Sequence, residues 1–183
     1  LLAILFSLAM AGNAGIFAML PLFLVSERGF ELGVANTLIG FSQLSGIVAI
    51  FFAGIIVDKF GQKRVIWFSL LCTAVLTFSL GLVEGWLLIL VLFLQPAILT
   101  LFFPAAFAAL ARIAHPTMRS VTSAMGPPLA FLVGGGVIPT VIGRLADSWS
   151  FAVGIMCAGI VIFAGSFLVY FVRLGGFDGE NGC

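Results

Sequence analysis

The stretch Gly54-Ile55-Ile56-Val57-Asp58-Lys59-Phe60-Gly61-Gln62-Lys63-Arg64 lies between two apolar runs, one that begins near Leu38 and one that starts at Val65. A short polar segment in such a place is typical of a tight hairpin between two membrane-spanning helices. Gly61 is predicted to supply the positive φ that a short reversal needs. Gly54 is predicted to let a neighbouring helix come close, since small residues allow apolar helices to approach one another in lipid.

The spacing G-x-x-x-D-K-x-G-Q-K-R of this stretch resembles the loop signature of the major facilitator superfamily of secondary transporters. In that family the signature joins the second and third helices of each six-helix half. The resemblance implies that Asp58 contacts the amino end of a helix in the opposite half and holds the inner gate shut. The alternative is an ordinary basic turn that happens to contain Gly and Asp. The residues assigned to a gating loop are Gly54, Asp58, Lys59, Gly61, Lys63 and Arg64.

The composition excludes most classes of soluble protein, because 62% of the residues are hydrophobic and 8% are charged. Soluble domains carry about 25% charged residues. The formal net charge of +1 gives no reason to expect a nucleic-acid partner. Cys72 and Cys157 lie in apolar runs and Cys183 ends a polar tail, so the cysteines predict no disulfide framework. The sequence also lacks a clustered set of metal ligands or catalytic residues, so we expect no cofactor and no enzyme. His115, beside Pro116, is predicted to be a solvated loop residue.

The expected fold is an all-α membrane protein, because six segments are long and apolar enough to cross a bilayer. An even number of spans places both termini on one side. The connections on that side, with the tail, hold six Lys and Arg residues against two on the other, which predicts that the hairpin and both termini are cytoplasmic. The six segments are residues 2–25, 34–57, 65–83, 86–113, 121–143 and 151–172.

A faint internal repeat supports the family resemblance. Gly54-x-x-x-Asp58 closes the second span and Gly143-x-x-x-Asp147 closes the fifth, which runs the opposite way. This arrangement predicts two three-helix units of inverted topology. Transporters of this family normally have twelve helices, so residues 1–174 resemble one six-helix half and residues 175–183 a cytoplasmic tail. Because the chain opens inside an apolar run at Leu1, we expect a fragment.

Two absences favour the carboxy-terminal half of such a transporter. The family's amino-terminal half often carries an intramembrane Arg before Gln and Gly in the fourth helix, whereas the sequence here is Leu-Phe-Leu-Gln95-Pro96. In the fifth helix of the family's antiporters, paired glycines closely follow a Gly-Pro. Here Gly134-Gly135-Gly136 comes too far after the Gly-Pro to match that pattern. We expect close helix packing to be the role of these three glycines.

Uncharged polar residues are the candidates for substrate contact, because no ionisable side chain falls in the middle of a span. By the family resemblance, the first and fourth helices of each half line the central cavity, which singles out Asn13 and Gln95. The alternative for both is a helix–helix hydrogen bond without a substrate role, which is the better interpretation for Gln43 and Ser45. Glu27 and Arg28 are expected to form an exposed pair.

The sequence therefore predicts a permease that moves a small solute by alternating access in the plasma (inner) membrane. Its partners would be the solute, membrane lipid and the missing six-helix half of the same chain, with no nucleic acid. Two alternatives remain open: a six-helix integral membrane enzyme and a non-transporting membrane assembly subunit. A transport assay on the full-length gene product would discriminate between these three functions.

Overall fold

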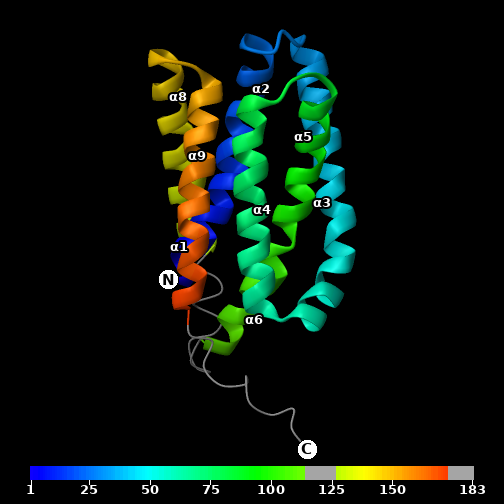
Figure 1. The fold of residues 1–183 in the computed structure, drawn as a ribbon, viewed down its shortest axis with the longest axis vertical. Helices are drawn as coiled ribbons and strands as arrows, with labels where there is room; N and C mark the ends of the chain where they lie inside the picture. Colours follow the sequence, from blue (N-terminus) through cyan, green and yellow to red (C-terminus); the bar gives the residue numbers. More distant parts are fainter. Residues whose placement is uncertain (114–126, 173–183) are drawn as a thin grey trace, which may run out of the picture.

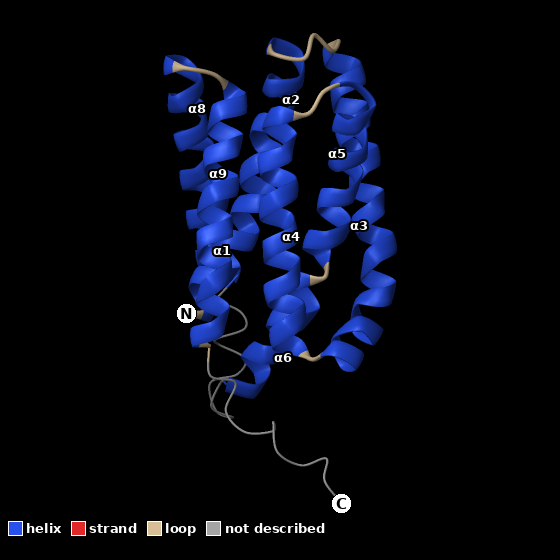
Figure 2. Cartoon of the chain, in the orientation of Figure 1, coloured by secondary structure: helices blue, strands red, loops and turns tan. Residues whose placement is uncertain are grey.

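The computed structural model describes residues 1–113 and 127–172, and within these ranges the chain forms helices joined by short turns (Figure 1, Figure 2). The described residues contain six helices that are long and apolar enough to cross a membrane, which confirms the predicted fold class. Five assignments made from the sequence lie outside the described residues: His115, Arg119, residues 121–126, Arg173 and the tail 175–183. The spans are Leu2–Ser26, Leu32–Phe60, Gln62–Leu82, Gly85–Arg112, Pro127–Ser148 and Phe151–Phe171.

Four of the spans are composite. The first consists of α1 (Leu2–Met10), the π-helical turn η1 (Ala11–Gly15) and α2 (Ile16–Ser26); the fourth of α5 (Gly85–Thr100) and α6 (Phe102–Ile113). The fifth contains the π-helical turn η3 (Leu132–Val137) and α8 (Ile138–Ser148), and the sixth contains α9 (Phe151–Ser166) and the 3₁₀ turn η4 (Phe167–Phe171). The second and third spans are the single helices α3 (Leu32–Phe60) and α4 (Gln62–Leu82). The fifth span continues through Ser148 instead of ending at the predicted Gly143.

The two π-helical turns lie against each other where the first and fifth spans pack together. A Cβ added at Gly15 would lie 2.6 Å from the carbonyl oxygen of Gly134, and one at Gly134 would lie 2.6 Å from the backbone nitrogen of Ala11. Only glycine fits at both positions, because the two backbones themselves are in contact. The predicted packing role therefore holds for Gly134. It does not hold for Gly136, since a Cβ there would meet nothing within 4 Å.

The helix pairings have the symmetry expected of two inverted three-helix units. The third span packs along the sixth, as α4 against α9. The second span packs on the fourth (α3 on α5), and the fifth packs on the first (η3 and α8 on η1, α1 and α2). Exchanging the spans of one unit for those of the other leaves this set of pairings unchanged, which is the relation that inverted repeats require.

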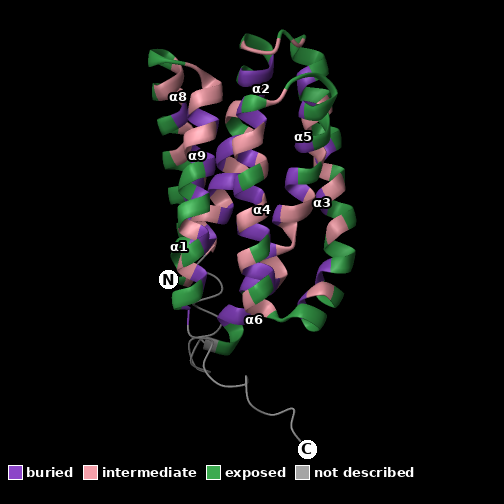
Figure 3. Ribbon diagram, in the orientation of Figure 1, coloured by how far each residue is buried: buried purple, intermediate pink, exposed green. Residues whose placement is uncertain are grey.

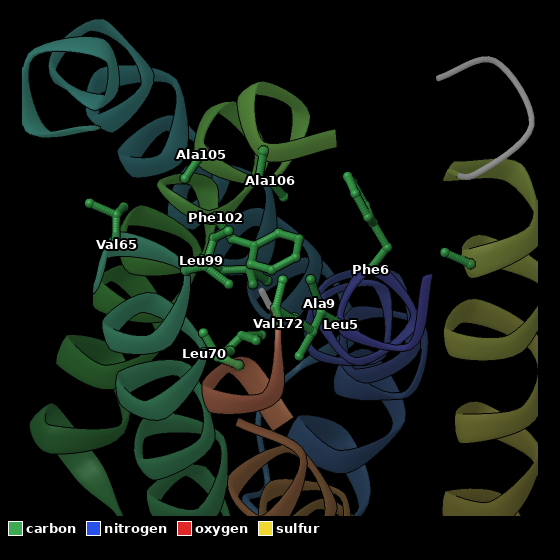
Figure 4. Packing of buried hydrophobic residues seen from close by; sticks show 14 of the residues in the cluster. Leu5, Phe6, Ala9, Val65, Leu70, Leu99, Phe102, Ala105, Ala106 and Val172 are labelled. Atoms are coloured by element: carbon green, nitrogen blue, oxygen red, sulfur yellow. The ribbon is translucent and has the colours of Figure 1, made fainter. Parts of the chain in front are cut away.

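The apolar core lies between the first, third, fourth and sixth spans. Figure 4 shows part of it, where Phe6 of α1 meets Phe102 of α6 edge to face with 5.4 Å between ring centroids. The second and fifth spans lie at opposite edges of the bundle and are the least covered (Figure 1, Figure 3). In the apolar stretch of each, 17% of the residues are buried, against at least 33% in the other four spans. Each therefore presents a large apolar surface to its surroundings.

The chain reverses between α3 and α4 at Gly61 alone. Gly61 has φ of +83°, a conformation that side chains with a Cβ rarely adopt, and its N–H caps α3 by donating to the carbonyl of Val57 at 2.9 Å. Its own carbonyl accepts from the N–H of Val65 at 3.2 Å, which starts α4. The prediction that Gly61 supplies the positive φ of the hairpin is thus confirmed.

Candidate functional site

The residues singled out from the sequence fall into two places: the end of the bundle that holds the α3–α4 turn, called the hairpin end below, and the middle of the bundle. The amino terminus lies toward the hairpin end, and so does the end of η4 (Figure 1). The opposite end, called the far end, holds the turns at residues 27–31, 83–85 and 149–150. This arrangement agrees with an even number of spans.

At the hairpin end, one of the basic residues ties the turn to the sixth span. Lys63 Nζ donates to the carbonyl oxygen of Tyr170 in η4 at 3.2 Å, and the Trp67 ring meets the Tyr170 ring edge to face at 5.8 Å. Lys59 lies over the ring of Phe60, 5.7 Å from its centroid. The side chain of Arg64 is exposed. Lys63 therefore has a structural contact within the chain, whereas Lys59 and Arg64 project from it.

Asp58 is exposed in the last turn of α3 and has no hydrogen-bond or ion-pair partner among the described residues. Gly54 precedes it by one turn, so the two share a face of the helix. A Cβ built at Gly54 would meet nothing within 4 Å in the described part of the chain, so no described helix approaches it. By contrast, Gly46 on the same helix is packed, since its Cβ position lies 2.8 Å from Thr100 Oγ1. The face with Gly54 and Asp58 is open.

At the far end the structure overturns the expected pair of Glu27 and Arg28. The Glu27 carboxylate accepts hydrogen bonds from the backbone N–H groups of Phe151 and Ala152, the latter at 3.0 Å. It therefore caps the amino terminus of α9, where the helix dipole favours a negative charge. The Oγ of Ser150 accepts from Val153 N at 3.2 Å, and the Ser150 carbonyl accepts from Gly154 N at 3.2 Å. All of the first four N–H groups of α9 are satisfied in this way.

Arg28 turns to the third span instead. Its Nη1 donates to Glu84 Oε1 at 2.7 Å, and its Nη2 donates to the Gly81 carbonyl at 3.0 Å. The guanidinium also lies over the Phe23 ring, 5.1 Å from the centroid. Neighbours in sequence thus bond to different spans, because the backbone after α2 sends the two side chains in different directions. The sequence has no signal for the Glu27 cap; only Ser150, a common N-cap residue before an apolar run, marks the start of α9.

In the middle of the bundle, Asn13 lies in the π-helical turn η1 and is half-buried, with no hydrogen-bond partner for its side chain among the described residues. Gln95 of α5 is fully buried, and its Nε2 donates to the Gly12 carbonyl oxygen at 2.7 Å. The two candidates are therefore brought to neighbouring places. The structure shows the helix–helix hydrogen bond that was the alternative for Gln95, and only Asn13 keeps exposed surface.

Ser45, for which a packing role was preferred, makes such a contact: its Oγ donates to the Phe93 carbonyl of α5 at 2.5 Å. Among the buried polar residues that the sequence did not single out are Thr73 and Thr77 of α4. A buried threonine in an apolar helix is common, so nothing in the sequence marks these two.

A bundle of six apolar helices in two inverted units, with a glycine-capped basic hairpin between its second and third spans, defines an integral membrane protein of transporter architecture. The family model of the Major Facilitator Superfamily matches residues 2–179. The chain belongs to the major facilitator superfamily, a family of membrane transporters, and this points to a non-enzymatic role.

Solved structures agree with this assignment. The chain is similar to a mutant of the peptide transporter POT in complex with sulfate, with a TM-score of 0.80 and 19% identity over 95% of this chain. It is also similar to that mutant in complex with alafosfalin, with a TM-score of 0.76 and 19% identity over 94% of this chain. The chain spans 38% of the length of these peptide transporters. At this identity the likeness shows the fold. No protein of curated function matches the sequence.

Proposed function

We propose that the chain is the carboxy-terminal six-helix half of a secondary transporter that moves a small solute by alternating access. The observation that carries the proposal is Asp58, an exposed carboxylate without a partner among the described residues. It lies at the carboxyl end of α3, where the dipole of its own helix disfavours a negative charge. Local stability therefore gives no reason for an aspartate here, whereas a contact with the amino end of a helix outside the chain does.

Gly54 supports the same proposal. It is placed one turn before Asp58 on an unobstructed face of α3, so a second helix can approach the backbone there without meeting a side chain. The exposed apolar surfaces of the second and fifth spans are available for a second six-helix half and for membrane lipid. In this proposal the partner half closes on the Gly54–Asp58 face when the hairpin side of the cavity is shut, and leaves it when that side opens.

For the substrate contacts we propose unequal roles for the two candidates. Asn13 carries an amide that keeps exposed surface midway along the first span, and this supports a contact with the solute. Gln95 is enclosed in this conformation and acts through its bond to the Gly12 carbonyl, one residue before Asn13. This bond holds the π-helical turn that presents Asn13.

The proposed orientation places the hairpin and both termini in the cytoplasm, with the protein in the plasma (inner) membrane. Within the described residues, the hairpin end carries Lys59, Lys63, Arg64 and Arg112, and the far end carries Arg28 and Arg144. In a background without Cys72, Cys157 and Cys183, a cysteine at the exposed Phe60 should react with an impermeant thiol reagent only from inside. A cysteine at the exposed Trp86 is the matched control and should react only from outside. Labelling of position 60 in intact cells would contradict the orientation.

Transport itself is tested with the full-length gene product in proteoliposomes, by measuring uptake of a panel of radiolabelled peptides, sugars, and organic cations and anions. We expect saturable uptake of at least one class of solute, and a lower rate in the Asp58→Asn variant at equal protein content. If no class is taken up, while the protein stays folded and co-purifies with another membrane protein, the assembly-subunit alternative replaces the proposal.

A further inference from the structure

Two buried hydroxyls in the third span are unusual because they have no hydrogen-bond partner among the described residues. The other fully buried hydroxyls of the third and sixth spans, and that of Thr100 in the fourth, donate to a carbonyl of their own helix: Ser69 to Ile66 at 3.1 Å, Thr100 to Pro96 at 2.8 Å and Ser166 to Phe163 at 2.7 Å. Thr73 and Thr77 of α4 are fully buried, yet neither Oγ1 has a hydrogen-bond partner within residues 1–113 and 127–172. They are one turn apart on the same face of the helix.

The side-chain amide of Gln95 contributes a hydrogen-bond acceptor, Oε1, that has no donor among the described residues. Its orientation is fixed, because Nε2 donates to the Gly12 carbonyl, and a flipped amide would bring two oxygen acceptors together. Oε1 must therefore point away from that carbonyl. It is buried, and no hydrogen-bond donor reaches it in the described part of the chain.

The side chains of Thr73 and Gln95 both contact Gly12 in the first span. The methyl carbon of Thr73 lies 3.1 Å from the Cβ position of Gly12, and Gln95 bonds to the carbonyl of the same residue. The other neighbours of that Cβ position are apolar, Ile162 of α9 at 3.4 Å and Leu99 of α5 at 3.7 Å. The side chains of Thr73 from the third span and Gln95 from the fourth thus approach the same residue of the π-helical turn of the first, midway along all three spans.

We propose that Gln95 Oε1 and the Thr73 hydroxyl, with Thr77 one turn further along, form a binding site for ordered water at the centre of the bundle. The hydroxyl hydrogen lacks an acceptor and the amide oxygen lacks a donor, and a water molecule supplies both. Buried waters typically make about three hydrogen bonds to such groups. No bulk water reaches the middle of an apolar bundle, so leaving these groups unpaired is unfavourable. The bound water links the third and fourth spans beside the turn that carries Asn13.

The direct test is a structure of the full-length protein at a resolution that shows internal waters. We expect density within hydrogen-bonding distance of both Gln95 Oε1 and Thr73 Oγ1, and its loss or marked weakening in Thr73→Val. The proposal is overturned if the wild type shows no such density and the Thr73 hydroxyl is turned onto the Ser69 carbonyl of its own helix.

Thermal stability gives a second test, because the expected change in melting temperature differs between a hydrated and a dry site. If the site is hydrated, Thr73→Val removes a hydrogen bond at nearly constant shape and should lower the melting temperature, by on the order of 2 °C. If the site is dry, the same change removes an unpaired hydroxyl and should leave the melting temperature unchanged or raise it, which contradicts the proposal. Thr100→Val is the matched control, because its hydroxyl is already bonded to Pro96 and its loss should lower the melting temperature in either case.

Discussion

The two ends of the bundle use their charged residues differently. At the far end, Glu27 of the first span caps the sixth, and Arg28 bonds to Glu84 and to the Gly81 carbonyl of the third. At the hairpin end, Asp58, Lys59 and Arg64 are exposed, and within the described residues none of them forms an ion pair. Glu27, Arg28 and Glu84 thus tie the far end together by contacts within the chain, although Glu31, Arg144 and Asp147 are exposed there without an ion pair among the described residues. The hairpin end leaves its acid and most of its bases for something outside the chain.

This difference separates two functions that charged residues at helix ends can serve. Contacts within the chain fix the spans of one half relative to each other, so that the half can move as a rigid unit. Unpaired groups on an open face are suited to a contact that forms in one conformation and breaks in the other. Substitutions at the far end should therefore change stability, and substitutions at the hairpin end should change transport.

The largest effect is expected from adding a side chain at the far end of the third span. A Cβ at Gly81 would lie 2.8 Å from the Ala152 carbonyl oxygen of α9, so Gly81→Leu forces α4 and α9 apart. Overpacking of this kind destabilises by about 1–3 kcal/mol or more, and the amount of folded protein in detergent, measured by fluorescence-detected gel filtration, should fall sharply.

The matched variant at the hairpin end is Gly54→Leu. None of the described residues lies against its Cβ position within 4 Å, so the folded amount should stay close to that of the wild type. Uptake should nevertheless fall, because the added side chain blocks the approach of the partner half. Equal losses of folded protein in both glycine variants would remove the distinction between the two ends.

A smaller loss of stability is expected from Glu27→Gln. The amide can still accept one hydrogen bond from the start of α9 but loses the charge that the helix dipole favours, which is worth about 0.3–1 kcal/mol near a surface. The melting temperature should decrease modestly, with little change in the affinity for substrate. An unchanged melting temperature would show that the far end is not held together in this way.

An effect on transport kinetics without a change in abundance is expected at Asn13. Loss of one hydrogen bond to a neutral solute costs about 0.5–1.5 kcal/mol, so Asn13→Ala should raise the apparent KM for uptake several-fold at normal abundance. Gln95→Ala should lower the melting temperature as well, because it also releases the Gly12 carbonyl. If Asn13→Ala leaves the kinetics unchanged, Asn13 has no substrate role.

The fold could be predicted from the sequence because its signals are local. Runs of about 20 apolar residues define the spans in lipid, and a glycine between two of them defines the reversal at Gly61. The Glu27 cap, the Gln95–Gly12 bond and the unpaired Thr73 hydroxyl were beyond prediction, since each depends on which spans are neighbours in space. The positions of the π-helical turns were missed for a similar reason: glycines are frequent here, and packing against another backbone decides which of them allow a wider turn.

The central claim is that Asp58 holds the hairpin side of the cavity closed, and it is tested by cysteine accessibility in the full-length transporter. Asp58→Asn keeps the shape of the side chain but removes its charge, and a charge at a helix end contributes up to ~2 kcal/mol when it is partly buried. Losing it from one conformation shifts the ratio of the two conformations by up to about thirtyfold. Asp147→Asn, an exposed aspartate in the matching Gly-x-x-x-Asp of the fifth span, is the control.

The account predicts that cysteines lining the hairpin side of the cavity react faster in Asp58→Asn than in the wild type. Cysteines on the far side should react more slowly, and Asp147→Asn should change neither rate. Wild-type labelling rates on both sides in a folded Asp58→Asn protein would contradict the account, because the hairpin would then be a basic turn without a part in gating.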